Sequence, residues 1–286
     1  MNPFSKFRLS RKKSVLLKNT VMLYILTFST YLMSFIVVPY ETRILGTEGY
    51  GLLGVAAAMM VYFQLVIDFG FILSATEEVS RNREDKRRLS RIFTAVTLNK
   101  LLLTLVSGIV LFALCRIVPR WHEHTLFFFL FFLATAINSL IPDYLYRGIE
   151  QMSAITIRTV LIKLFFTVMI FLLLKSPSDY CIIPLLNIIG NLGALLGVYV
   201  HLFRKLGIRF ERITRADFWH SFRQSNTFFL SRIASTAYTA ANTVILDILS
   251  AGTSTAFYSS ADKLITTAKN GLSPISDSLY PYMTKN

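Results

Sequence analysis

The chain has 286 residues, of which 53% are hydrophobic and 16% are charged, and its formal net charge is +14. Soluble globular chains have about 25% charged residues, so this composition excludes an ordinary soluble domain. The apolar residues form long uninterrupted runs, which is typical of a polytopic helical membrane protein because helices satisfy their own backbone hydrogen bonds in lipid. The basic residues lie beside these runs, so no nucleic-acid partner is expected.

The first predicted element is a hydrophobic hairpin over residues 16–76, with arms at 16–44 and 50–76. Each arm is longer than the roughly 20 apolar residues that cross a bilayer core of about 30 Å. The Gly-rich segment 45–51 between the arms is expected to form the turn. Pro39 lies in the first arm and is expected to bend its helix, because proline cannot donate a backbone hydrogen bond.

Six further hydrophobic spans follow the hairpin. They cover residues 92–118, 126–147, 154–174, 180–203, 226–250 and 255–283. The expected fold class is therefore an all-α polytopic membrane protein with about eight transmembrane helices. Gly46-Thr47 and Gly252-Thr253 mark two similar helix–turn–helix units that are 206 residues apart. This short repeat predicts one complete six-helix lobe followed by the first two helices of a second lobe.

The predicted domains meet at a basic segment. Residues 1–203 form the six-helix lobe with a basic cytoplasmic leader, residues 204–223 form a basic cytoplasmic interfacial linker, and residues 224–286 hold the two helices of the incomplete second lobe. In the linker, Thr214 and Asp217 have the spacing of a capping box before an aromatic run, which predicts a short interfacial helix bound to anionic lipid. A plain basic linker is the alternative.

The distribution of Lys and Arg over the short loops predicts the orientation of the chain in the membrane. The segments proposed for the cytoplasmic side carry 20 of these residues, and the segments proposed for the outer side carry 4. The N-terminus is therefore expected to be cytoplasmic. The first span is expected to stay uncleaved, since it is too long for the apolar region of a signal peptide.

The sequence offers no candidate for catalysis, so we expect neither an enzyme nor a cofactor. It contains no Walker A motif and no HExxH motif, and His122 and His124 are interpreted as interfacial polar residues rather than metal ligands. Cys115 and Cys181 are expected to be buried thiols, with a disulfide between them as the alternative.

Four charged side chains are predicted at a similar depth in the membrane: Asp68, Lys100, Lys163 and Arg232. With a rise of roughly 1.5 Å per residue, all four lie roughly 9–14 Å from the cytoplasmic ends of their helices. One carboxylate neutralises one cation, and two further buried cations without an anion would be costly. We therefore expect a cavity, wetted from the cytoplasm, that binds an anionic headgroup. The alternative is that Asp68 pairs with Arg232 while both lysines extend to the inner interface.

Three further residues extend this prediction. Lys269 lies nearer the middle of its span and would continue the basic path outward. Pro39 and Pro274 would give their helices fixed kinks that suit a rocking motion, with simple tolerated kinks as the alternative. No metal ligand is expected in this site.

Several short motifs, spread over nearly the whole chain, are similar to those of a known family. They are the segments 39–46, 50–51, 68–71, 74–76, 88–93, 142–144, 147–152, 258–264, 273–275 and 279–283. On these motifs the sequence resembles the Wzx-type oligosaccharide flippases, which are polysaccharide biosynthesis proteins of the multidrug/oligosaccharidyl-lipid/polysaccharide exporter superfamily.

The resemblance implies two six-helix lobes related by pseudo-symmetry and a location in the bacterial cytoplasmic (inner) membrane. It also implies a substrate, an undecaprenyl-pyrophosphate-linked oligosaccharide that is moved from the cytoplasmic to the periplasmic leaflet for O-antigen, capsule or exopolysaccharide synthesis. The pyrophosphate would suit the surplus of cations predicted above, with Asp68 as their charge partner or in ion coupling. Membrane lipid, a polysaccharide polymerase and a chain-length regulator would be partners.

Members of this family have two full lobes, whereas only the opening pair of the second lobe is predicted here. We therefore expect a truncated product, a partial sequence or one part of an assembly, and no independent transport. The alternatives are a nonfunctional remnant, a multidrug exporter of the same superfamily, and a membrane glycosyltransferase or polysaccharide polymerase. An exporter of cationic drugs would favour an acidic cavity, and the enzymes would present a larger loop.

Overall fold

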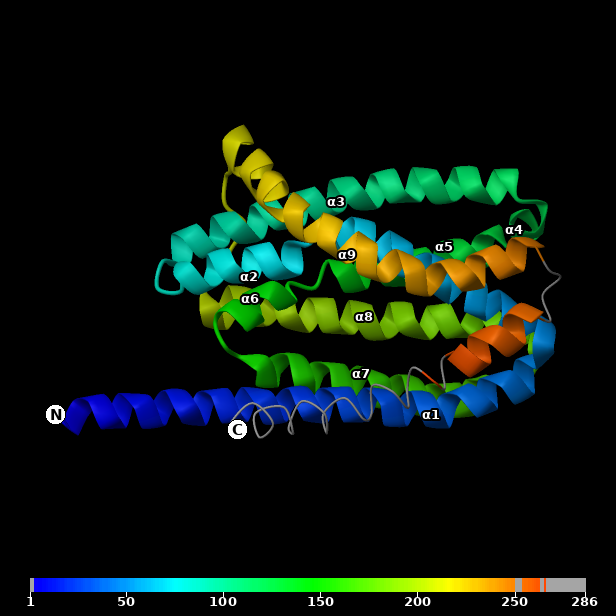
Figure 1. The fold of residues 1–286 in the computed structure, drawn as a ribbon, viewed down its shortest axis with the longest axis horizontal. Helices are drawn as coiled ribbons and strands as arrows, with labels where there is room; N and C mark the ends of the chain where they lie inside the picture. The colour runs from blue at the N-terminus through cyan, green and yellow to red at the C-terminus, as the bar shows by residue number, and fades with distance from the viewer. Residues whose placement is uncertain (1–2, 250–253, 263–264, 266–286) are drawn as a thin grey trace, which may run out of the picture.

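The computed structural model describes residues 3–249, 254–262 and 265, and within these residues it is helical and has no strands (Figure 1). Five of the described helical stretches are long and apolar enough to cross a membrane. They are Tyr24–Arg81, Lys86–Ile117, Thr125–Gly148, Met152–Leu173 and Pro177–Leu206. This confirms the all-α polytopic membrane class, whereas the number of eight crossings stays a prediction.

Helix α1 (Pro3–Asp68) contains the first arm of the predicted hairpin and most of the second. It is interrupted at Gly46, where φ is 68° and ψ is −175°, and its second part runs back along the bundle (Figure 1). Glycine adopts a positive φ at little cost because it has no Cβ. The predicted turn is therefore a single-residue break. Pro39 lies inside α1 as expected, and its role as a kink stays a prediction; Pro274 lies outside the described residues.

A second break, which the sequence pattern does not predict, separates α1 from α2 (Phe71–Arg81). Its residues, Phe69 and Gly70, have φ values of 38° and 76°. Helix α3 (Lys86–Ile117) then begins after Asp85, whose carboxylate accepts hydrogen bonds from two backbone N–H groups of the first turn at 2.9 and 3.0 Å. Such a cap satisfies donors that a helix start leaves open.

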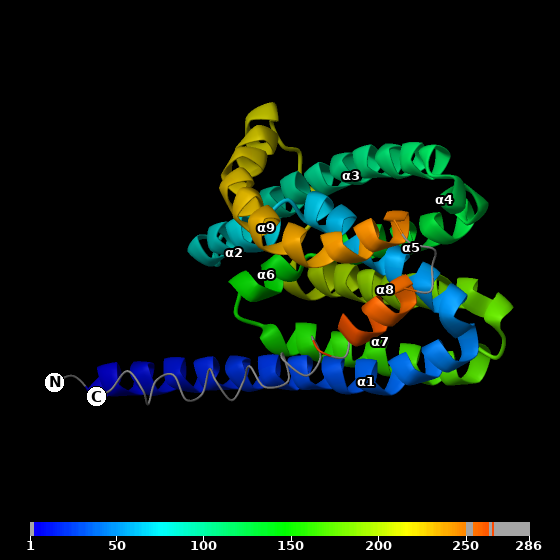
Figure 2. The same ribbon diagram turned by 45° about the vertical axis from the view of Figure 1, so that its right-hand side comes forward.

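Shorter elements and two long helices complete this bundle. They are α4 (Pro119–Glu123), α5 (Thr125–Ser139), α6 (Asp143–Gly148), α7 (Met152–Leu173), the 3₁₀ helix η1 (Pro177–Cys181), α8 (Ile182–His201) and the π-helical turn η2 (Leu202–Leu206). The predicted span 126–147 is divided between α5 and α6, because Pro142 ends the first and precedes the second. Helix α1 packs against α7, and α5 packs against α8 (Figures 1 and 2).

Helix α9 (Arg215–Leu249) differs from the predicted linker. The capping box is confirmed: the N–H of Thr214 donates to Asp217 Oδ2 at 3.0 Å, and the N–H of Asp217 donates to Thr214 Oγ1 at 3.2 Å. The helix then continues to Leu249 instead of ending as a short interfacial helix, because no Gly or Pro interrupts it. The predicted boundary after residue 223 thus falls inside α9, and Gly252-Thr253 lies outside the described residues.

Two clusters of buried apolar side chains join the helices. One, near α4, includes Phe63, Leu111, Cys115, Trp121, Phe127 and Phe128, and the other, near α2 and α6, includes Phe71, Val79, Phe93, Tyr144, Leu145 and Tyr146. Both cysteines are free thiols, with Cys115 buried and Cys181 partly buried. The predicted burial is therefore confirmed for the first cysteine and holds in part for the second.

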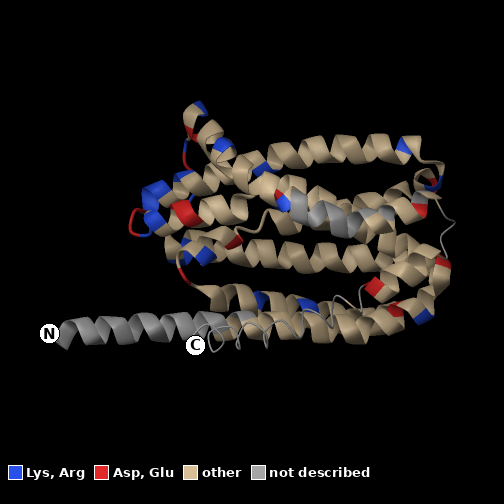
Figure 3. Cartoon of the chain, in the orientation of Figure 1, with Lys and Arg blue, Asp and Glu red and all other residues tan. Residues whose placement is uncertain are grey.

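Lys and Arg residues gather at one end of the described bundle. Figure 3 shows them around the α2–α3 turn, at α6 and at the start of α9, and fewer of them at the opposite end. This is the end that the loop charges assign to the cytoplasm. The cytoplasmic location of the N-terminus stays a prediction.

Candidate functional site

A cavity of about 480 Å³ lies among α1, α5, α7 and α8. Its charged wall residues are Glu41, Arg158 and Lys163. Its neutral polar wall residues are Ser34, Asn138, Thr159, Thr167, Asn187 and Asn191, and the apolar ones include Val37, Leu53, Phe131, Ile162, Phe166 and Ile183. The wall therefore carries two basic groups and one acidic group on a mixed polar and apolar lining.

The spacing of the polar residues explains why they meet in this cavity. On α7, Thr159, Lys163 and Thr167 are separated by four residues each, and on α8 the same spacing separates Asn187 from Asn191. Residues four apart lie on the same face of a helix. In helices this apolar, polar side chains are expected to face the bundle interior or a wet cavity.

Arg158 enters the cavity wall as one partner of an ion pair. Its Nη2 lies 2.8 Å from Asp143 Oδ1 and donates to Asp143 Oδ2 at 3.1 Å. Asp143 stands in the first turn of α6, directly after Pro142, so the break between α5 and α6 places the carboxylate beside α7. The guanidinium has five N–H donors, and this pair uses only part of them.

The predicted charge at Asp68 is held by Lys100. The Lys100 ammonium lies 2.8 Å from Asp68 Oδ1 and donates a further hydrogen bond, 2.5 Å long, to the carbonyl oxygen of Ser139. The two side chains are 6% and 20% exposed for Lys100 and Asp68, respectively. The described partner of Asp68 is thus Lys100.

The described structure places the predicted cations in different surroundings. Lys163 lines the cavity, Lys100 is paired with Asp68, and Arg232 is exposed on α9. Lys269 lies outside the described residues. Depth along a helix was predictable from residue spacing, whereas the direction of each side chain around its helix was not.

Sequence reasoning missed several wall residues. Arg158, Asn138, Asn187 and Asn191 are not among the residues that the sequence predicted for the site. The signal that could have found the α8 amides is their four-residue spacing within an apolar run. Asn138 belongs to another helix, so its neighbours become known only from the fold.

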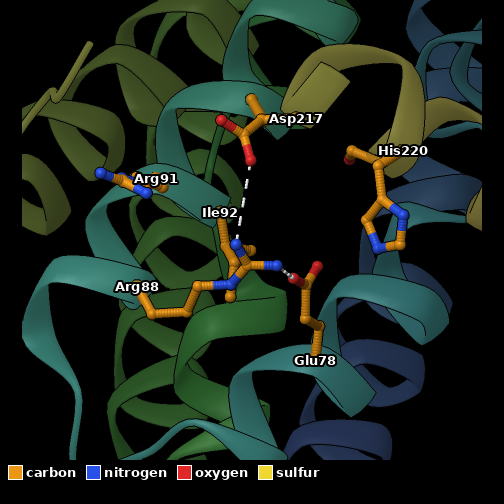
Figure 4. Close-up of a pocket in the computed structure, with 8 residues that line it drawn as sticks. Glu78, Arg88, Arg91, Ile92, Asp217 and His220 are labelled. Carbon is orange, nitrogen blue, oxygen red and sulfur yellow. Dashed lines mark hydrogen bonds and ion pairs between the residues drawn. The ribbon is translucent and has the colours of Figure 1, made fainter. Parts of the chain in front are cut away.

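A second group of charges joins α9 to the first bundle at the basic end; we call it the inner contact. Arg88 lies between Glu78 and Asp217, at 2.7 Å and 3.8 Å from their carboxylate oxygens (Figure 4). Hydrogen bonds from Thr214 hold the pKa of Asp217 below its ordinary value, and the charge of Arg88 adds to this effect. A small pocket between them is also lined by Arg91, Ile92, Ala95, His220 and Ser221.

The break between α1 and α2, at Phe69 and Gly70, also packs against α9 and adds to the inner contact. The Phe69 ring is stacked between Phe222 and Phe229 of α9, with centroid distances of 4.3 Å to each. Gly70 approaches α9 so closely that a Cβ there would lie 2.8 Å from the carbonyl oxygen of Ser225. The positive φ of this glycine and its missing side chain are therefore both needed where α9 packs.

An outer contact joins the other end of α9 to α4. Asp247, whose side chain is 3% exposed, accepts hydrogen bonds from Arg120 Nη1 at 2.8 Å and from Trp121 Nε1 at 3.2 Å. A buried carboxylate is stable only when it is paired and hydrogen-bonded. Helix α9 is thus fixed to the first bundle at both ends.

Comparisons with known proteins agree along almost the whole chain. A family model described as "Polysaccharide biosynthesis protein" matches residues 16–286. A curated relative from Escherichia coli (strain K12), named "Putative O-antigen transporter", is 27% identical over 280 residues, which cover 96% of this chain and 66% of the relative. A relative of the same name from Shigella dysenteriae is 28% identical over 280 residues, which cover 94% of this chain and 67% of the relative. The chain thus spans about two thirds of the length of these relatives, and no solved structure gives a significant match.

Proposed function

The chain belongs to the polysaccharide biosynthesis protein family, and on that premise we propose that it carries lipid-linked oligosaccharides across the bacterial inner membrane. The substrate would be an undecaprenyl-pyrophosphate-linked repeat unit that moves from the cytoplasmic to the periplasmic leaflet. The names of the two relatives support a role in O-antigen export. The apolar helices support a multi-pass carrier.

The observation that carries this proposal is the basic wall of the cavity. Lys163 and Arg158 both line it, and Glu41 is the one acidic residue among its described wall residues. Ammonium and guanidinium groups form strong, charge-assisted hydrogen bonds with phosphate, and these are stronger where water is scarce. A lysine and an arginine with N–H groups left for further hydrogen bonds fit a pyrophosphate better than a cationic drug.

The two cations would act differently on the pyrophosphate. Arg158 is oriented by Asp143, so its remaining N–H groups are directed before the substrate arrives. Lys163 lies on the same wall, and its ammonium group would bind the same phosphate oxygens. We propose that these residues hold the headgroup while the polyprenyl chain stays in lipid.

The other predicted residues keep a proposed role in the basic path. Lys100, Arg232 and Lys269 would attract the headgroup at other stages of transport, and Asp68 would balance Lys100 or couple transport to an ion. Access to the cavity would alternate between the two sides of the membrane. A polysaccharide polymerase and a chain-length regulator would receive the product.

Complementation of a flippase-deficient strain tests this function. The chain is expressed together with any further part of the protein that its gene encodes, and surface polysaccharide is quantified. Lys163→Ala should lower the polysaccharide by about tenfold or more, since a lost charge-assisted bond is worth about 1.5–3 kcal/mol. Lys163→Arg should restore most of it, because the charge is kept.

Lys175→Ala is the matched control, since Lys175 is exposed beyond the end of α7 and lies outside the cavity. Each variant must reach the membrane in equal amount on an immunoblot. Unchanged polysaccharide in Lys163→Ala would contradict the role assigned to the cavity.

A further inference from the structure

The neutral polar groups of the cavity form a set that phosphate binding does not require. They are Ser34 on α1, Asn138 on α5, Thr159 and Thr167 on α7, and Asn187 and Asn191 on α8. Polar side chains inside a membrane are costly and by default indicate a functional site. Two basic residues already serve an anion, so the neutral groups call for a ligand that is itself neutral and polar.

The hydrogen bonds of the two α8 amides show what they can offer. Asn187 Nδ2 donates to the carbonyl oxygen of Ile183 at 3.0 Å, and Asn191 Nδ2 donates to the carbonyl oxygen of Ala134 at 3.0 Å. A carboxamide has two N–H donors and one carbonyl acceptor. Each amide is thus oriented by one bond and keeps one N–H and its oxygen for a ligand.

The hydroxyl group of Ser34 is oriented in a similar way. Its Oγ donates to the carbonyl oxygen of Thr30 at 3.0 Å, so toward a ligand it can act only as an acceptor. An acceptor of this kind repels phosphate oxygens but binds a hydroxyl proton. Donors and acceptors that lie together at fixed positions match the hydroxyl groups of a sugar, because each hydroxyl group donates one hydrogen bond and can also accept one.

We propose that this wall, centred on Asn187 and Asn191, is a sugar subsite that selects the oligosaccharide, while Lys163 and Arg158 bind the pyrophosphate. The inference rests on the proposed function, and it gives the sugar part of the lipid-linked substrate its own binding residues. The rings of Phe131 and Phe166 also line the cavity and offer apolar surface to the C–H faces of the sugar rings. A volume of about 480 Å³ accommodates a few sugar rings and not the polyprenyl chain.

Two binding measurements on the purified full chain in detergent test whether sugar and pyrophosphate bind to different residues of the cavity. Saturation-transfer NMR follows two neutral disaccharides, chitobiose and lactose, and ³¹P line widths follow inorganic pyrophosphate. Asn187→Leu should reduce saturation transfer to the disaccharides about fivefold or more and leave the pyrophosphate line width unchanged. Lys163→Ala should do the reverse.

Asn187 is the cleaner position because its amide bonds within its own helix, whereas that of Asn191 bonds α8 to α5. If Asn187→Leu lost both ligands, the substitution would have changed the packing of the cavity. Thr167→Val, which exchanges a hydroxyl for a methyl group, would then be the deciding variant. It should lose disaccharide binding and keep pyrophosphate binding. Disaccharide binding that persists in the deciding variant, or that is absent from the wild type, would overturn the sugar subsite.

A failure of the sugar subsite can be distinguished from a failure of the proposed transport function. Normal disaccharide and pyrophosphate binding in a chain that never restores surface polysaccharide would contradict transport but support the subsite. Reduced polysaccharide in Asn187→Leu, at unchanged pyrophosphate binding, would identify the lipid-linked sugar rather than a free sugar as the occupant.

Discussion

At the scale of single residues, Lys100 and Asp68 show how this protein holds an enclosed charge: each is the counter-charge of the other. The ammonium is almost fully enclosed, and its described contacts are Asp68 Oδ1 and the carbonyl oxygen of Ser139. A buried pair contributes little net stability, because both charges lose their hydration. Removing one member is costly, because the other stays buried without its counter-charge.

We therefore predict that Asp68→Asn destabilises the protein more than Lys100→Met combined with Asp68→Asn. The single change leaves a buried cation beside a neutral amide and should cost about 3 kcal/mol, whereas the double change removes both charges. The melting temperature of the purified protein in detergent measures the difference. Equal melting temperatures for the two variants would show that the pair carries no such coupling.

Residue spacing alone placed Asp68 and Lys100 at matching depths, and the structure brings them into contact. The same reasoning could not separate Lys163, which lines the cavity, from Arg232, which is exposed on α9. A small error in the angle around a helix axis moves a side chain from a cavity to the surface. Residue spacing therefore predicted the depth of Asp68 and Lys100, but not which charged side chains line the cavity.

At the scale of elements, local signals were read correctly and tertiary ones were missed. Gly46 ends the first arm of the hairpin, and Thr214 with Asp217 starts α9, as their residue types predicted. The break at Phe69 and Gly70 was not predicted, because it depends on the stacking of Phe69 between two rings of α9. Such long-range contacts have no signature in a short window of sequence.

Helix α9 yields a prediction about its outer contact. Asp247→Ala removes the acceptor of Arg120 and Trp121, so α4 should separate from α9 more often. Losing about 1.5–3 kcal/mol of charge-assisted hydrogen bonding should raise the population of the open form about tenfold or more. The buried thiol of Cys115, which belongs to the same apolar cluster as Trp121, reports this opening through its rate of maleimide labelling.

The measurement uses a Cys181→Ser background, so that Cys115 is the one thiol present. Glu123→Ala is the matched control, because Glu123 is an exposed acidic residue of the same short helix. Labelling at the wild-type rate in Asp247→Ala would show that the outer contact does not restrain α9.

At the scale of the whole molecule, composition and motifs were sufficient for the class and the family. The long apolar runs predicted a helical membrane protein, and the family match over residues 16–286 confirms the resemblance found in the motifs. The cavity could not be predicted in the same way. It is formed by side chains from four helices, α1, α5, α7 and α8, so its shape depends on how these helices pack.

The central claim is that the headgroup of the lipid-linked substrate enters this cavity, and photocrosslinking tests it most directly. Benzoylphenylalanine is placed at Phe166, which lines the cavity, or at Leu172, which is exposed on the same helix, in cells that make radiolabelled lipid-linked oligosaccharide. We predict a light-dependent adduct at Phe166 that Lys163→Ala abolishes, and none at Leu172. Equal adducts at both positions, or an adduct at Phe166 that is insensitive to Lys163→Ala, would contradict the claim.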